Sequence, residues 1–483
     1  MRKKARKVRE ILENVEILSA GAEGMAVAKP GDKVVFVPFA APGDVVDLVV
    51  LRKKKSFIEA KISAIHQFSK QRTAPRCQHF TVCGGCKWQH LAYEHQLAFK
   101  AQQVRDTFDR IGKFSYPPLL PIMGSEKQYE YRNKLEFTFS NRRWLVEKPA
   151  AGSLTDESLN GLGFHLPGMF DRILDIEHCH LQEEPSNAIR RAVKDYATAH
   201  GLSFYDVKKN EGLLRNLIIR NVAIDQWMVI LVVSEANEAI LKGLLPHLSA
   251  RFPQISSLIY VVNTKKNDQI SDLEAVVFSG SPFLIAHMDS PVSGQPSLKF
   301  QVGPVSFFQT NSAQAERLYR LVFNLAGFTG NETVYDLYSG TGTIALYVAK
   351  AVRKVIGIEY VEESVNDART NALLNEIENV SFVAGDMPKV LSNDFVAQHG
   401  RPDVVITDPP RAGMHPDVVA QLLEIKAEKI VYVSCNPATQ ARDISLLSTI
   451  YSVEKVQPVD MFPQTQHVEN VALLRLKSDT ERA

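Results

Sequence analysis

Residues 333–343 read Thr-Val-Tyr-Asp-Leu-Tyr-Ser-Gly-Thr-Gly-Thr, a short apolar run followed by a glycine turn. The run predicts a buried strand over 333–337, and the turn opens a predicted helix over 344–351. A second predicted strand over 354–358 ends at Glu359. In a Rossmann-like sheet, an acid about 20 residues after the glycines accepts hydrogen bonds from a ribose.

Three more predicted strands follow, and each has a polar residue after its carboxyl end. These are 380–383 with Asp386, 404–407 with Asp408, and 430–433 with Cys435. Ligands of open α/β sheets bind at the carboxyl ends of strands. A single aspartate after a strand is more often a turn residue, but the ordered series indicates a class I S-adenosylmethionine methyltransferase fold. We therefore expect Glu359 to accept from the ribose and Asp386 to lie near the adenine.

Five cysteines occur in the chain, and four of them form a group. Cys77, Cys83 and Cys86 are spaced so that three thiolates can face one centre, and two glycines between the last two allow a tight turn. Cys179 supplies a fourth ligand from a distant segment. Four thiolates suit zinc or iron, and their spacing leaves the metal open.

Nothing in the chain predicts secretion or a membrane span. The N-terminus begins Met-Arg-Lys-Lys and has no apolar core before Ile11, which argues against a signal peptide. The apolar run at 227–233 is far shorter than the roughly 20 residues that a span needs. An odd cysteine count also fits a reducing compartment better than a disulfide framework. We expect a cytoplasmic protein that is monomeric and contacts no membrane.

The first part of the chain is basic. Residues 1–76 contain 16 Lys and Arg against 8 Asp and Glu, whereas the whole chain has a net charge of +2. A basic module on a near-neutral body is typical of polyanion binding, although a solvated basic start explains residues 2–9 equally well. Short β-prone runs alternate with glycine and proline turns over 15–65, which predicts a small barrel. The basic cluster at 52–55 is expected at a loop or strand end.

The middle of the chain is less explicit. Helical periodicity over 93–111 and 186–200 alternates with strand-like runs over 135–139, 217–222 and 227–233, which predicts an α+β domain. The sequence Tyr-Arg-Asn-Lys at 131–134, followed by Phe137 and Phe139, combines cations with aromatic rings in a way that suits RNA. An amphipathic strand edge explains the same residues.

Five short sequences resemble the signatures of RNA uracil-C5 methyltransferases. They are Phe-Phe-Gln-Thr-Asn at 307–311, Asp-Leu-Tyr-Ser-Gly-Thr-Gly at 336–342, Asp-Pro-Pro-Arg at 408–411, Ser-Cys-Asn-Pro-Ala-Thr at 434–439 and His-Val-Glu-Asn-Val at 467–471. With the cysteine quartet and a start that resembles a TRAM domain, the chain is similar along its length to the branch that makes 5-methyluridine in 23S ribosomal RNA.

This resemblance implies a multidomain α/β architecture. Residues 1–67 would form a TRAM domain, an OB-like RNA-binding barrel. Residues 68–300 would form a central α+β domain with an iron–sulfur site and an RNA-binding surface, and residues 301–483 the Rossmann-like methyltransferase domain. The resemblance also implies that the cysteine quartet holds a [4Fe–4S] cluster.

The chemistry of uracil explains why a cysteine and a carboxylate are needed. Carbon 5 becomes nucleophilic only when a thiolate adds at carbon 6 and turns the ring into an enolate. Cys435 is the candidate nucleophile because it lies outside the quartet, and Glu469 is the candidate base that removes the carbon 5 proton after methyl transfer. Taken alone, Cys435 reads equally well as a small buried residue and Glu469 as a surface carboxylate.

Binding roles follow for the remaining motif residues. Gln309 and Asp408 are expected to hold the uracil and the methyl donor, since an amide both donates to and accepts from a pyrimidine edge and a carboxylate accepts from the N3–H that cytosine lacks. Tyr338, Gly340 and Thr343 are expected in the S-adenosylmethionine site. The target uridine must leave its stack, so we expect a flipped nucleotide in a loop of folded RNA. Ribosomal RNA is the first candidate for that RNA.

Other functions share part of this pattern. A nucleic-acid amino-methyltransferase also uses Asp-Pro-Pro but needs neither Cys435 nor Glu469. An RNA cytosine-C5 methyltransferase usually has a cysteine directly after Asp-x-Pro, where this chain has Arg411. A non-enzymatic RNA-binding protein with structural zinc would explain the barrel and the cysteine quartet. It would give no role to the polar residues that follow the predicted strands. A tRNA uracil-C5 methyltransferase shares the chemistry and differs in its RNA.

Overall fold

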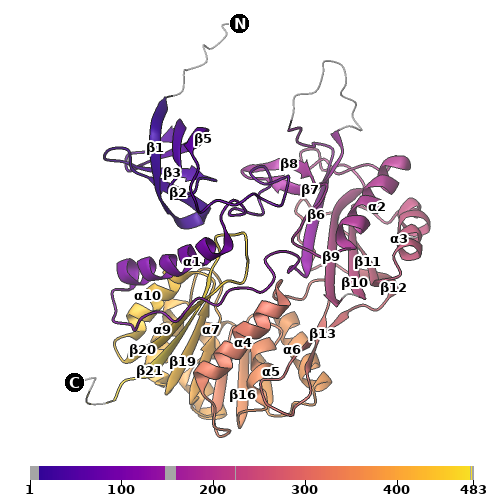
Figure 1. Cartoon of the computed structure of the whole chain (residues 1–483). Coiled ribbons are helices and arrows are strands. Elements are labelled where there is room, and N and C mark those ends of the chain that lie inside the picture. Colours follow the sequence, from indigo (N-terminus) through magenta and orange to yellow (C-terminus); the bar gives the residue numbers. More distant parts are fainter. Residues whose placement is uncertain (1–9, 147–158, 224, 479, 481–483) are drawn as a thin grey trace.

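The computed structural model describes residues 10–146, 159–223, 225–478 and 480. Among the described residues, a closed barrel, two seven-stranded sheets and a two-stranded hairpin are present, and the barrel comes first in the chain (Figure 1). Its strands, in the order β1-β2-β3-β5-β4, are β1 (Ile11–Ala20), β2 (Met25–Ala28), β3 (Val34–Pro38), β4 (Val45–Lys53) and β5 (Phe57–Gln67). Alternate residues such as Val35 and Val37 point into its core. The predicted barrel is confirmed, and the basic cluster begins at the exposed end of β4.

The second β-structure is a seven-stranded sheet in the middle of the chain, in the order β12-β11-β10-β9-β6-β7-β8. Its strands are β6 (Lys134–Ser140), β7 (Gly161–Leu166), β8 (Met169–Asp175), β9 (Leu214–Ala223), β10 (Gln226–Val233), β11 (Ile255–Val262) and β12 (Ala275–Gly280). Helices α2 (Ser186–Ala199) and α3 (Leu245–Arg251), the latter preceded by the π-helical turn Ile240–Leu244, pack on one face. The predicted strands and the 186–200 helix are confirmed.

The aromatic residues at the start of this sheet do not face solvent. Tyr131, Phe137 and Phe139 are buried, the last two in the core between the sheet and α2. The RNA-stacking interpretation of these side chains is therefore wrong. Alternation along β6 places Phe137 and Phe139 on the apolar side of an amphipathic strand.

The last third forms a seven-stranded sheet in the order β17-β16-β15-β18-β19-β21-β20. Its strands are β15 (Thr333–Leu337), β16 (Lys354–Glu359), β17 (Val380–Ala384), β18 (Val404–Thr407), β19 (Lys429–Ser434), β20 (Tyr451–Val459) and β21 (Glu469–Leu476). β15 to β19 are parallel, and β21 runs antiparallel between β19 and β20. This arrangement confirms the class I methyltransferase fold.

Helices cover both faces of this sheet. One face packs against α4 (Ser312–Ala326), α5 (Thr343–Ala349) and α6 (Glu362–Leu374), with the hairpin β13 (Leu284–Met288) and β14 (Leu298–Val302) beside them. The other face packs against α7 (Met387–Val390), α8 (Asn393–His399), α9 (Pro416–Ile425) and α10 (Pro437–Leu447).

Helix α1 (Tyr93–Thr107) lies away from the middle sheet that follows it in sequence. It continues into a π-helical turn (Phe108–Gly112), and Val104 and Phe108 join the core of the last sheet beside α10. Figure 1 shows α1 lying across α10. Residues 93–112 are thus built onto the methyltransferase fold.

Across the described ranges, no helix combines the length and the apolar character that crossing a membrane requires.

Candidate active site

Strand register brings the motif residues to one edge of the last sheet. Leu337 of β15 pairs with Thr407 of β18, so Tyr338 and Asp408 follow neighbouring strands at the same level. Ser434 of β19 pairs with Asn470 of β21. Because these two strands are antiparallel, the register carries Cys435 to a position opposite Glu469. The two candidate catalytic residues therefore meet although they lie on separate motifs.

A cavity of about 420 Å³ opens at this edge. Seven of the predicted residues line it: Gln309, Tyr338, Gly340, Thr343, Asp408, Cys435 and Glu469. Glu359 and Asp386 are not part of its lining.

Further residues line the same cavity and had no role in the sequence interpretation. Six with aromatic or charged side chains stand out among them: Phe307, Tyr319, Asp336, Arg411, Phe462 and His467. Four of these six lie inside the quoted motifs, so their position beside assigned residues was the available signal. Tyr319 and Phe462 lie outside every motif, and only the folded chain brings them here.

The glycine turn shapes one wall of the cavity. Gly342 has φ +78°, and a Cβ there would lie 2.8 Å from the Phe382 ring, so the position requires glycine. The amide N–H of Gly340 donates to Oε2 of Glu359 at 2.9 Å, which holds this acid beside the turn. Tyr338 has φ +64°, a conformation that costs a non-glycine residue energy and is held by its surroundings.

Asp386 lies on the outer flank of the same edge. It precedes α7 at the end of β17, and its carboxylate pairs with Nζ of Lys389 at 3.2 Å. Glu359 at the end of β16 pairs in register with Ala384 of β17. The two acids thus follow adjacent strands, next to the glycine turn but outside the enclosed part of the cavity.

The cavity contains more carboxyl groups than cations. Burial, together with the nearby charge of Asp408, raises the pKa of Glu469 to about 8, against a smaller lowering by Arg411. Burial raises the pKa of Asp408 to about 7, and burial with Asp408 raises that of Asp336 well above its usual value. No side chain among the described residues bonds to the carboxyl oxygens of Asp336, and only the nearby backbone N–H of Ala345 opposes the rise in its pKa. A positively charged ligand would stabilise the charged forms of these carboxyl groups, so the site favours a cationic ligand.

Cys435 lies between these acids and a helix terminus. Burial and the charges of Glu469 and Asp408 raise the pKa of its thiol to about 11. The next residue, Asn436, caps α10 with its side chain and also donates through Nδ2 to the Arg411 carbonyl at 2.9 Å. The partial positive charge of a helix N-terminus stabilises a nearby thiolate, so α10 offsets part of this cost.

The cysteine quartet lines a second cavity, of about 370 Å³. Cys77, Cys83 and Cys86 come from one loop, and Cys179 from the segment before α2. The Cys179 backbone is fastened to the side chain of Asn187 by hydrogen bonds of 2.8 and 3.2 Å. None of the five cysteines forms a disulfide. The fold therefore gathers the four predicted ligands around one space.

The quartet is not arranged as a compact site for one ion. Within the part of the chain that the structure describes, no three His, Cys, Asp or Glu side chains are grouped so that they could hold a metal ion. Burial raises the thiol pKa of Cys86 to about 11 and that of Cys179 to about 12. Four such thiols become thiolates together only beside positive charge.

Comparison with known proteins agrees with this geometry. The sequence model of the family described as tRNA (Uracil-5-)-methyltransferase matches residues 291–477. An RNA methyltransferase of Bacteroides thetaiotaomicron is 52% identical over 94% of this chain and 100% of its own length. One of Porphyromonas gingivalis is 51% identical over 95% of this chain and 99% of its own.

A solved structure is similar along the whole chain. The Pyrococcus abyssi tRNA (uracil-54, C5)-methyltransferase in complex with S-adenosyl-L-homocysteine is 30% identical, with a TM-score of 0.73 over 95% of this chain and 99% of that one. Fold, site and relatives together define an S-adenosylmethionine-dependent RNA methyltransferase. Within that class, the chain belongs to the RNA uracil-C5 methyltransferase family.

Proposed function

We propose that this chain transfers the methyl group of S-adenosylmethionine to carbon 5 of a uridine in RNA through a covalent adduct between Cys435 and carbon 6. The observation that carries the proposal is the position of Cys435 opposite Glu469, inside one cavity. A nitrogen methyltransferase needs neither residue, and the arginine after Asp-Pro-Pro disfavours the cytosine-C5 chemistry.

The reaction proceeds in two stages. The Cys435 thiolate adds to carbon 6, and the electron pair that this addition moves onto carbon 5 attacks the methyl group, which releases S-adenosylhomocysteine. The Glu469 carboxylate then removes the proton from carbon 5. The electron pair of that C–H bond restores the C5–C6 double bond and expels the Cys435 thiolate, so the enzyme is regenerated.

The acids of the cavity suit the methyl donor. S-adenosylmethionine carries a sulfonium and an ammonium charge, which match the carboxyl groups of the buried Asp336 and the half-buried Asp408. In this proposal Glu359 accepts from the ribose, Asp386 lies near the adenine, and Tyr338, Gly340 and Thr343 line the site. Gln309 then offers its amide to the uracil.

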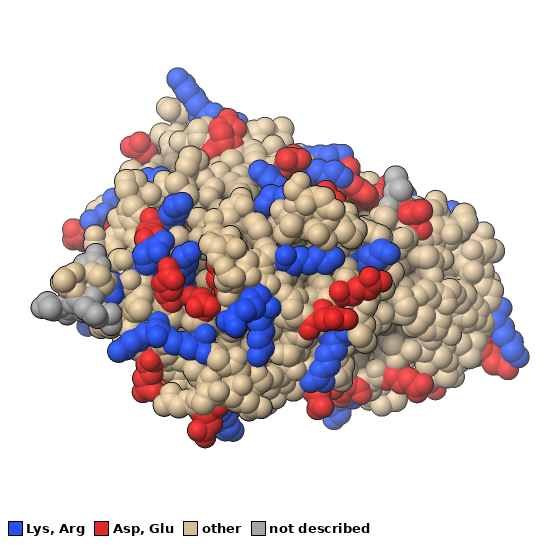
Figure 2. Space-filling view, turned by 90° about the horizontal axis from the view of Figure 1, so that it is seen from below, with Lys and Arg blue, Asp and Glu red and all other residues tan. Residues whose placement is uncertain are grey.

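The rim of the cavity supports entry of a base that has left its stack. Phe307 lines the cavity and is 67% exposed, so its ring offers a stacking surface to RNA. The face that lies underneath in Figure 1 carries Lys and Arg intermixed with Asp and Glu, as Figure 2 shows. Intermixed charges attract a polyanion poorly, so we expect RNA to bind on the side where the barrel lies.

Two RNA substrates are proposed. Ribosomal RNA comes first, because the chain resembles the 23S branch in its barrel and its cysteine quartet. Transfer RNA comes second, favoured by the similarity to the Pyrococcus abyssi enzyme. Mapping 5-methyluridine in both RNAs from a strain lacking the gene decides between them. Loss of a ribosomal site supports the first substrate, loss of a tRNA site supports the second, and unchanged uridine methylation in both contradicts the proposal.

We expect the reaction to accelerate as pH rises. Glu469 and Cys435 both act in their deprotonated forms, and their pKa values are raised to about 8 and about 11. Glu469 acts only after methyl transfer, the first irreversible step, so kcat/KM for RNA depends on the Cys435 thiol alone. It should therefore rise about tenfold per pH unit between pH 6 and 7, at saturating S-adenosylmethionine. Methyl-donor affinity is measured at each pH as a control, because Asp408 also titrates. A flat profile contradicts the assigned roles.

We also propose that the cysteine quartet holds a [4Fe–4S] cluster with a structural role. The support is the donor set, since four thiols from two distant segments line one cavity and Cys thiolates are the ligands of such clusters. When bound, the cluster supplies the positive charge that keeps four buried cysteines deprotonated. Methyl transfer moves no single electron, so no redox step is assigned to it.

Anaerobically prepared protein should be brown and contain about four iron and four sulfide per chain. Cys83→Ala should lose this iron and lower solubility and RNA affinity more than S-adenosylmethionine affinity. Cys435→Ala is the matched control and should keep the iron, since Cys435 lies in the other cavity. One tightly bound zinc without sulfide contradicts the cluster, and the methyltransferase proposal survives that result.

A further inference from the structure

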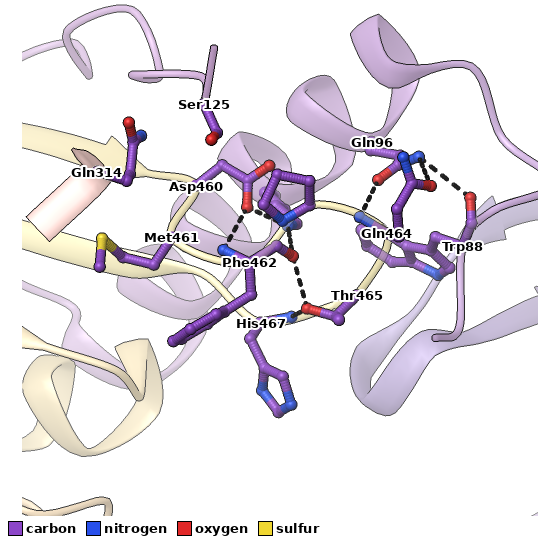
Figure 3. Close-up of polar contacts among 12 residues, drawn as sticks. Trp88, Gln96, Ser125, Gln314, Asp460, Met461, Phe462, Gln464, Thr465 and His467 are labelled. Carbon is purple, nitrogen blue, oxygen red and sulfur yellow. Dashed lines mark hydrogen bonds and ion pairs between the residues drawn. The ribbon is translucent and has the colours of Figure 1, made fainter. Parts of the chain in front are cut away.

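The segment 460–467 joins β20 to β21 and carries two side chains into the catalytic cavity. Phe462 and His467 line that cavity, and Glu469 follows two residues after His467. In Figure 3 both rings project from one side of the loop, while its other side faces helix α1. Local bonds brace it, including Thr465 Oγ1 donating to the Phe462 carbonyl at 2.7 Å.

The residues directly after Cys86 hold this segment. The backbone amides of Lys87 and Trp88 both donate to the Gln464 carbonyl, at 2.9 and 3.0 Å. Gln96 of α1 and Gln464 exchange two hydrogen bonds, Gln96 Nε2 to Gln464 Oε1 at 3.0 Å and Gln464 N to Gln96 Oε1 at 2.9 Å. Gln96 and Gln464 are both buried, so water cannot replace these bonds.

The amino end of the segment is held by a buried ion pair. Lys100 Nζ lies 2.6 Å from Asp460 Oδ1, and both side chains are 0% exposed. Lys100 also donates to the Phe462 carbonyl at 3.1 Å, and the Tyr93 hydroxyl donates to Asp460 Oδ2 at 2.8 Å. Removing one partner from such a group leaves a buried charge unpaired, so α1 and this segment are held together firmly.

Arg132 forms a second connection. It lines the cysteine cavity, and its guanidinium lies 5.5 Å from the centre of the Phe462 ring. Phe462 in turn lines the catalytic cavity. One side chain therefore contacts both the space around the quartet and an aromatic wall of the active site.

We propose that residues 460–467 form a positioning segment that makes the catalytic cavity depend on the cysteine loop, with Gln96 and Arg132 as positioning residues for methyl transfer. The proposal rests on the proposed uridine methylation. It gives the quartet a role in catalysis without electron transfer, since the loop that carries Cys86 sets the place of Phe462 and His467. Small displacements of groups around reacting atoms cost up to about a hundredfold in rate.

Gln96→Ala tests the segment directly, and Gln102→Ala is the matched control. Gln102 is the same residue type on the same helix, but it is exposed, and its side chain donates to Asp106 at 2.7 Å and accepts from Arg105 at 3.0 Å, both on α1 itself. We expect Gln96→Ala to lower the single-turnover rate of methyl transfer between tenfold and a hundredfold, with the S-adenosylmethionine dissociation constant changed by less than about twofold. Gln102→Ala should change neither.

Hydrogen exchange supplies a readout independent of activity. Peptides covering 460–468 should exchange faster in Gln96→Ala and in Cys86→Ser than in the parent protein, and at the parent rate in Gln102→Ala. Unchanged exchange in Cys86→Ser overturns the connection to the cysteine loop. If Gln96→Ala does not fold, Arg132→Lys replaces it, because lysine keeps the charge but loses the planar group over Phe462.

A double-mutant cycle with Phe462→Leu decides whether Gln96 acts through the segment. If it does, Gln96→Ala should slow the Phe462→Leu protein by less than about threefold. If the rate losses of the two single variants multiply in the double variant, the proposal is overturned, because independent losses indicate general destabilisation. The parent protein is assayed first for 5-methyluridine: no product there refutes the proposed function itself, whereas normal product with multiplying effects refutes only the positioning role.

Discussion

Replacing Cys435 with alanine is expected to lower the rate of methyl transfer by roughly four orders of magnitude or more. The thiolate does not merely assist the reaction, because without addition at carbon 6 the uracil ring has no nucleophilic carbon 5. S-adenosylmethionine binding should change by less than about twofold, since the thiol is used only in the chemical step. Single-turnover transfer of a labelled methyl group and calorimetric titration of the methyl donor measure the two quantities.

The structure supplies controls for this result. Cys435 stands apart from the cysteine cavity, so the variant should keep the iron content and the thermal stability of the parent. Cys435→Ser should be almost as slow, because a serine hydroxyl is a far weaker nucleophile than a thiolate at neutral pH. Full activity in Cys435→Ala excludes the covalent mechanism.

Replacing Glu469 with glutamine is expected to stop the reaction halfway. Addition and methyl transfer need no base at this position, but the carbon 5 proton then has no acceptor and the thiolate cannot leave. The enzyme should accumulate as a methylated covalent adduct with RNA, while turnover falls by at least about a thousandfold. Glutamine preserves the volume of the side chain, and removing a buried carboxyl with a raised pKa should not harm folding.

A denaturing gel with labelled RNA detects the adduct, and mass spectrometry shows whether it carries the added methyl group. The double variant Cys435→Ala with Glu469→Gln is the control and should give no adduct. If Glu469→Gln is inactive and yields no adduct under conditions in which the parent methylates RNA, then the carboxylate acts before methyl transfer. That outcome removes Glu469 from the role of final base.

Local patterns predicted much of the architecture. Short apolar runs ended by glycine or a polar residue gave the five parallel strands of the last sheet to within about two residues, because buried strands leave a strong local signal. The glycine turn and the barrel strands gave equally clear local signals. The sequence at 131–139 suggested RNA binding wrongly. Aromatic residues recur at every second position both on the buried face of a strand and on a strand that stacks on RNA bases, so the pattern does not separate the two.

The placement of α1 had no such signal. Its periodicity predicted a helix over 93–111, but nothing local indicates that it packs on α10 and not on the middle sheet. Gln96 and Gln464 lie 368 residues apart in sequence and meet only in the folded chain. Phe462 and His467, which line the cavity, belong to the segment that this contact joins to α1.

The sequence by itself determined the methyltransferase fold, the two candidate catalytic residues and the three clustered cysteines, because each lies in a short motif of characteristic residue types, and it added Cys179 from a distant segment. Only the tertiary structure decided that Cys435 lies opposite Glu469, that Asp336 and Asp408 line the same cavity, and that the residues after Cys86 bond to the segment before Glu469. The physical reason is that strand register, burial and long-range hydrogen bonds arise from packing between distant segments, which no local pattern encodes.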